Sequence, residues 1–134
     1  MKRRSSRSTR GVRAQKDRGA VAVEFALVAP ILLALVAGIV EFSHAYNLQI
    51  SVTQAAREAA REMAIENDQT AAATAAAAGA PGLNAGAFAY TFSPGACSAD
   101  ENMMVTITYQ AATLTGIFGN TLTVNGVGAM RCGG

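Results

Sequence analysis

The stretch that decides the fold is AVAVEFALVAPILLALVAGIV, residues 20–40, an apolar run with one charged side chain, Glu24. A bilayer core of about 30 Å is spanned by about 20 helical residues, so the run is long enough to cross a membrane. Pro30 lies inside it and has no amide hydrogen to donate, so we expect it to kink the helix. The run therefore predicts one transmembrane helix.

Charge is distributed unevenly around this run. Residues 1–19 contain eight Lys or Arg and one acid, a net charge of +7, whereas residues 20–134 contain three basic and eight acidic residues, a net charge of −5. Basic residues beside a span favour its cytoplasmic side. We therefore expect a single-pass protein of the cytoplasmic membrane, with its N-terminus inside and residues 41–134 forming an exterior domain.

Within the basic segment, residues 1–18 are rich in Arg and Ser and have no apolar periodicity, so we expect them to be disordered in water. A basic tail can also bind phosphates without sequence preference. No aromatic side chain that could stack on bases lies among these basic residues. An orientation signal is the better interpretation, and no nucleic-acid partner is expected.

The composition narrows the class of protein further. The chain has 134 residues, of which 51% are hydrophobic and only 15% are charged, against about 25% charged in an average soluble domain. This length suits one small domain, and this composition excludes a chain that is disordered throughout.

Three interpretations of the N-terminus remain open at this level. A secretory signal peptide normally has a shorter apolar region, of about 7–15 residues, although Ala37-Gly38 could imitate its cleavage site. An uncleaved anchor explains the span but gives no role to Glu24. The third interpretation is cleavage between Gly19 and Ala20, with Glu24 fifth after the cut and followed by Phe25. This arrangement resembles the processing site of type IV prepilins.

The sequence from Arg18 to Ala64 resembles the TadE-like proteins, which are minor pilins or pseudopilins of the tight-adherence (Flp) pilus system. The resemblance is carried by Gly19, by Val23-Glu24-Phe25, by Pro30, by the stretch from Gly38 to Phe42, and by the small-residue helix from Ala55 to Arg61. It implies cleavage by a prepilin peptidase, and partners among pilin subunits, the assembly machinery and membrane lipid. It also implies that Glu24 pairs with the new amino group of a neighbouring subunit, which would lower the cost of both charges in an apolar core.

Beyond the span, the pattern predicts an α+β domain of pilin-like type. The helix continues to residue 66, with an apolar stripe of Leu48, Val52, Ala55, Ala59 and Met63. The simplest partner for that stripe is the chain's own sheet, and a neighbouring subunit is the alternative. Arg57 and Arg61 share another face of the helix and are candidates for subunit docking.

The remainder of the chain predicts a short helix and three strands. Asp68 can cap an Ala-rich surface helix that Gly79 and Pro81 end. Alternating runs that begin near Phe88, Met103 and Thr121 predict a small antiparallel sheet packed on the long helix. We expect Leu114, Ile117 and Phe118, in the last long connection, to turn inward.

Cys97 and Cys132 are the two cysteines, and both lie in the part predicted to be exterior, where disulfides persist. A bond between them is therefore expected, with two free thiols as the alternative. His44 has no nucleophile motif around it, and the sequence has no Gly-rich phosphate loop. We expect no enzyme, no metal and no cofactor.

These observations favour a minor pilin or pseudopilin that helps to assemble a tight-adherence pilus and reaches the pilus or the cell surface. The alternative is an uncleaved single-pass envelope protein with an exterior binding domain.

Overall fold

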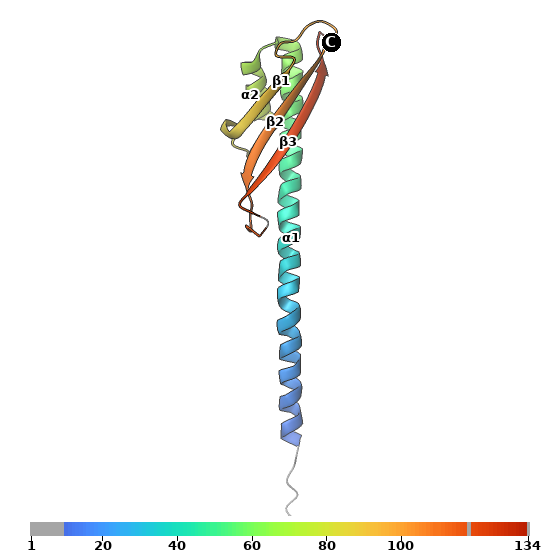
Figure 1. The fold of residues 1–134 in the computed structure, drawn as a ribbon, viewed down its shortest axis with the longest axis vertical. Helices are drawn as coiled ribbons and strands as arrows, with labels where there is room; N and C mark the ends of the chain where they lie inside the picture. Colours follow the sequence, from blue (N-terminus) through green and yellow to red (C-terminus); the bar gives the residue numbers. More distant parts are fainter. Residues whose placement is uncertain (1–9, 118, 134) are drawn as a thin grey trace, which may run out of the picture. The chain divides into compact units, whose positions relative to one another are not determined.

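The computed structural model describes the backbone of residues 10–117 and 119–133, and side chains from Gly19 onward. A long helix, α1 (Arg10–Glu66), is followed by α2 (Gln69–Gly79), the 3-10 turn η1 (Ala85–Ala87) and the strands β1 (Phe88–Ser93), β2 (Asn102–Ala112) and β3 (Thr121–Arg131) (Figure 1). The predicted α+β, pilin-like fold is confirmed. The chain divides into two compact units, which meet between Ile39 and Val40 and are described in turn.

The first unit is the N-terminal part of α1. The helix begins at Arg10, although we expected residues 1–18 to be disordered in water. Adding a residue to an existing helix costs little, and Arg, Gln, Lys and Ala are good helix formers. This extension therefore follows from propagation out of the apolar run. The part of that prediction that falls on residues 1–9 lies outside the described residues.

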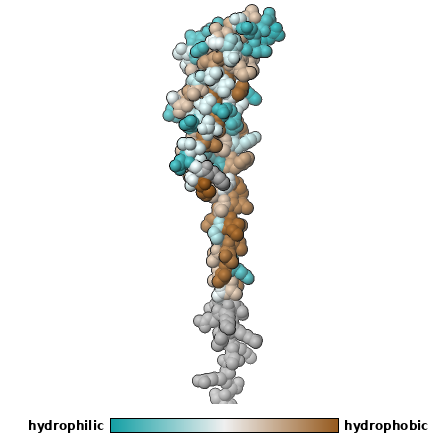
Figure 2. All heavy atoms as spheres, in the orientation of Figure 1, coloured by the Kyte–Doolittle hydropathy of each residue, from teal (hydrophilic) through white to brown (hydrophobic). Residues whose placement is uncertain are grey.

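The apolar run leaves its side chains uncovered, as Figure 2 shows in brown on the face it draws. Val21, Phe25 and Leu33 are 63%, 73% and 70% exposed. Among the residues that the structure describes, α1 is the one helix whose length and composition would let it cross a bilayer. At about 25 cal/mol per Å² of apolar surface, such exposure in water is costly, so this segment requires an apolar environment.

The second unit packs the C-terminal half of α1 on a three-stranded antiparallel sheet of order β1-β2-β3. The helix contributes the predicted stripe, and the sheet contributes alternate residues of each strand, as period-two patterning requires. The fully buried residues that α1 and the sheet contribute to this core are Val52, Ala55, Ala56, Ala59, Ala60, Met63, Met103, Val105 and Ile107. The prediction that the stripe covers the chain's own sheet is therefore correct.

Strand β3 approaches α1 closely because two of its residues lack side chains. A Cβ atom placed on Gly126 would lie less than 3.0 Å from the Val52 carbonyl, and one on Gly128 less than 3.0 Å from the Ala56 carbonyl. Backbone at that distance cannot give way as a flexible side chain can. The pair of glycines thus sets the distance between the sheet and the helix.

Helix α2 starts at Asp68, whose carboxylate accepts hydrogen bonds from the Thr70 and Ala71 amides at 2.6 and 3.2 Å. The predicted N-cap is confirmed. The expectation of a surface helix with little to bury is wrong for one face, since Ala72 and Ala76 are fully buried. A methyl side chain lets the helix lie close to its neighbours, so poly-alanine still contributes to the core.

At one end of the sheet, Cys97 in the β1–β2 connection forms a disulfide with Cys132, with Cα atoms 5.6 Å apart. Asn67, between the two helices, accepts a 2.6 Å hydrogen bond from the Cys97 amide and donates one of 3.3 Å to its carbonyl. Arg131 pairs with Asp100 at 2.7 Å. The helix junction, the β1–β2 connection and the end of the chain are thereby joined.

At the opposite end lies the β2–β3 loop, residues 113–120. We expected its apolar residues to turn inward, and this is wrong for Leu114 and Ile117, which are 58% and 60% exposed. The core is already filled by strand and helix residues, which leaves no space for them. Phe118, the third of the set, lies outside the described residues.

Candidate processing and assembly site

Gly19 and Ala20 lie within α1 and are exposed. A Cβ atom on Gly19 would have no neighbour within 4 Å, so nothing among the described residues explains a glycine here by packing. Glycine is the slimmest backbone that a chain can offer to an enzyme cleft. Gly19 is therefore an exposed position on the helix, and cleavage after it stays a prediction.

Glu24 is exposed among apolar neighbours, of which Phe25 is 73% and Val28 is 51% exposed. Within the described residues, no hydrogen bond or ion pair is made to its side chain. Four residues of helix rise about 6 Å, so Ala20 lies one turn away on the same face. The structure places Gly19, Ala20, Glu24 and Phe25 in successive turns of one uncovered helix, and whether they act in processing and assembly stays a prediction.

Pro30 lies inside the same helix, which continues through it. Proline removes the hydrogen bond that would go to the carbonyl of Ala26, four residues earlier. That carbonyl is therefore left free for another donor, and a kink at this point remains an expectation.

Arg57 and Arg61 are both exposed, on the side of α1 away from the buried alanines. Arg61 lies 4.0 Å from Glu58, with side chains 65% and 35% exposed, and Gln54 donates to Glu58 at 3.0 Å. Exposed pairs of this kind contribute little to stability, typically under about 1 kcal/mol. Both guanidinium groups are thus available to a partner, which is what a docking role would require.

Sequence reasoning did not find the environment of Glu41, the residue that follows the apolar run. Its side chain is buried, and the residue is only 7% exposed. The carboxylate accepts bonds from the Leu114 amide at 3.1 Å, and from both the amide and the hydroxyl of Thr115 at 2.9 Å. A carboxylate at the end of an apolar run was a visible signal, but its partners lie more than 70 residues away in the sequence.

The electrostatics of Glu41 follow from these contacts. Burial acts to raise the pKa of the carboxyl group, while the hydrogen bonds from Thr115 and Leu114 and the nearby His44 favour the ionised form. The balance lowers the pKa of Glu41 below its ordinary value of 4.5. The charge is thus retained in the folded protein and holds the loop against the helix.

Among the described residues, no three His, Cys, Asp or Glu side chains come together in a way that could hold a metal ion. Cys97 and Cys132 are joined in the disulfide, and His44 lies beside Glu41.

Comparison with known proteins locates a family signal in the same part of the chain. The family model described as TadE-like protein matches residues 19–61. No curated protein matches the chain. No solved structure matches it either. The matched segment, which begins at Gly19 and contains Glu24, Glu41, Arg57 and Arg61, is thus similar to the TadE-like family.

Proposed function

We propose that this protein is a minor pilin or pseudopilin of a tight-adherence (Flp) pilus, cut after Gly19 by a prepilin peptidase and held by the helix of residues 20–40 until assembly. The observation that carries the proposal is the position of Gly19. It ends a segment of net charge +7, it precedes the apolar run, and it is the first residue of the TadE-like match.

Glu24 supports the assembly part of the proposal. A carboxylate within an apolar segment is costly, by about 2.5–3.5 kcal/mol at the bilayer centre on insertion scales, and such residues usually have a functional partner. Cleavage after Gly19 would create a cationic amine on Ala20. Paired between neighbouring subunits, the amine and the carboxylate would each lower the cost of burying the other.

The first test is the intact mass and N-terminal sequence of the protein from its native membrane fraction. We expect a chain that begins at Ala20, because the leader would be removed before assembly. Gly19→Leu should block cleavage by widening the backbone at the cut, and Gly38→Leu is the matched control within the same helix. A native chain that retains residues 1–19 would contradict processing and would favour the uncleaved envelope protein with an exterior binding domain.

The second test is Glu24→Ala. We expect membrane insertion to remain intact, since the change makes the run more apolar, and incorporation into sheared pili to fall. Glu24→Gln separates charge from size, because it keeps the shape and loses the ion pair. Glu66→Gln, at the end of α1 and outside the apolar run, is the control. Normal piliation with Glu24→Ala would remove the assembly role.

A further inference from the structure

The β2–β3 loop exposes two large apolar side chains. Leu114 and Ile117 are 58% and 60% exposed, and neither belongs to the core. The pairing of Ala112 with Thr121 places the loop at one end of the sheet, and the pairing of Asn102 with Arg131 places the disulfide at the other. Leu114 and Ile117 thus lie at the end of the sheet opposite the disulfide.

Hydrogen bonds to Glu41 hold this loop at one position along α1. Its carboxylate accepts bonds of 2.9–3.1 Å from the Leu114 and Thr115 amides, and the Thr113 amide closes the loop onto the Asn120 carbonyl at 3.3 Å. Glu41 follows Val40, the last residue of the apolar run, without interruption. The loop is therefore tied to the first turn beyond the segment that requires an apolar environment.

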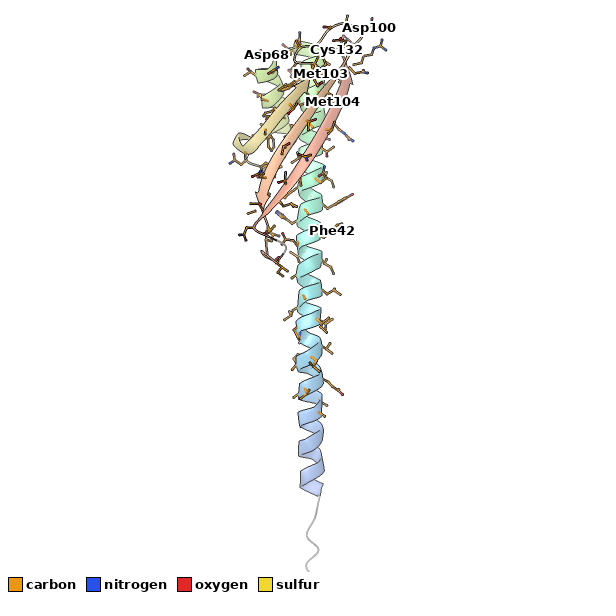
Figure 3. All side chains as sticks on the ribbon, viewed as in Figure 1. Phe42, Asp68, Asp100, Met103, Met104 and Cys132 are labelled. Atoms are coloured by element: carbon orange, nitrogen blue, oxygen red, sulfur yellow. A yellow bond between two sulfur atoms is a disulfide. The ribbon has the colours of Figure 1, made fainter. Side chains whose placement is uncertain are left out.

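The helix is itself apolar and aromatic at this level. Phe42 is 74% exposed and Tyr46 is 60% exposed; Figure 3 labels Phe42 at the height on α1 that the loop reaches. Aromatic side chains concentrate where a bilayer meets water, because they combine an apolar body with affinity for the headgroup region. Within the second unit, exposed apolar or aromatic side chains thus lie both on α1, at Phe42 and Tyr46, and in the loop.

We infer that the β2–β3 loop is a membrane-contacting element, in which Leu114 and Ile117 enter the boundary between headgroups and acyl chains beside the span. The occupant is lipid because the loop is bonded to the residue that directly follows the apolar run. Since the loop amides satisfy the Glu41 carboxylate, no bare carboxylate accompanies the apolar side chains toward the bilayer. The inference rests on the anchoring helix and does not depend on pilus assembly.

The chain has no tryptophan, so single tryptophans can report depth in the full-length protein. Ile117→Trp, reconstituted in phosphatidylethanolamine–phosphatidylglycerol vesicles, should be quenched by lipids brominated near the headgroup. Ala99→Trp, exposed in the β1–β2 connection at the other end of the sheet, is the matched control and should not be quenched. Leu33→Trp, inside the span, should be quenched most by bromines deep in the acyl chains.

The link to Glu41 is tested in the Ile117→Trp background. Glu41→Ala should reduce quenching, because it releases the loop from the helix, whereas Thr115→Val removes one of the bonds and should reduce it less. Formation of the Cys97–Cys132 bond, read from the mass of each variant, shows that the domain still folds. Quenching that is unchanged by Glu41→Ala in a folded domain would overturn the role of the carboxylate.

The remaining outcomes separate the alternatives. If Leu33→Trp is quenched while Ile117→Trp behaves like Ala99→Trp, the loop contact is wrong and the proposed pilus function is untouched. Shielding of Ile117→Trp that grows with the protein-to-lipid ratio would assign the loop to a second copy of the chain and would overturn the lipid contact. Absence of quenching at Leu33→Trp would overturn the anchor and the loop contact together.

Discussion

Glu41 illustrates how a single residue can connect distant parts of the chain. It belongs to α1, yet its carboxylate is held by amides of residues 114 and 115. A buried carboxylate is stable only when hydrogen bonds replace its lost hydration, and three donor groups do so here. Removing the Glu41 carboxylate would leave the donors of residues 114 and 115 without their acceptor. Removing those donors would leave the buried carboxylate without hydrogen bonds.

The lowered pKa of Glu41 predicts a pH dependence of stability. The carboxyl titrates near 4.5 in the unfolded chain and at lower pH in the folded one, so its contribution is full above pH 4.5 and is lost as pH falls through the folded value. In detergent, the urea midpoint of Glu41→Gln should therefore be below that of the wild type at pH 7, with the gap closing in acid. An equal gap at pH 7 and pH 3 would contradict this assignment.

At the scale of elements, the contact between α1 and β3 depends on small residues on both sides. Ala55, Ala56, Ala59 and Ala60 of the helix are fully buried, and Gly126 and Gly128 face the helix backbone. Interiors pack as densely as organic crystals, so a contact made between two backbones has no slack for an added methyl group. The close approach of α1 and β3 thus depends on the absence of bulky side chains at these positions.

Gly128→Ala should consequently destabilise the domain by about 1–3 kcal/mol or more, because overpacking forces the backbone to shift. Urea unfolding followed by circular dichroism measures the loss. Gly95→Ala is the matched control, since a Cβ there meets nothing within 4 Å, and it should change stability by less than about 0.5 kcal/mol. Similar midpoints for the two variants would show that β3 can move away from the helix at little cost.

At the scale of the whole molecule, the two units differ in what stabilises them. Residues 10–39 form a helix, and the apolar side chains of its run from Ala20 are uncovered, whereas the second unit, which begins at Val40, has a core, a sheet and a disulfide of its own. A domain of under 100 residues buries a modest fraction of its surface, so a covalent link contributes a large share of its stability.

The disulfide closes a separation of 35 residues. In the chain-entropy model a loop of that size contributes about 3–4 kcal/mol by restricting the unfolded chain. The double variant Cys97→Ser, Cys132→Ser should therefore unfold at lower urea, by a free energy of that order, as should the wild type in reducing agent. Equal losses of stability in the double variant and in the reduced wild type would show that the loss comes from the missing bond and not from the serine side chains. Unchanged stability in both would show that the bond is dispensable.

The sequence by itself determined the elements, because their signals are local. Each signal is formed by residues that are close together in the sequence. This holds for the apolar run, the helical stripe from Leu48 to Met63, the Asp68 cap and the alternation in the three strands. The tertiary structure decided what depends on distant neighbours: the partners of Glu41, the need for Gly126 and Gly128, the burial of Ala72, and the outward direction of Leu114 and Ile117. These features arise from packing between segments tens of residues apart, and periodicity carries no information about which segments meet or how closely.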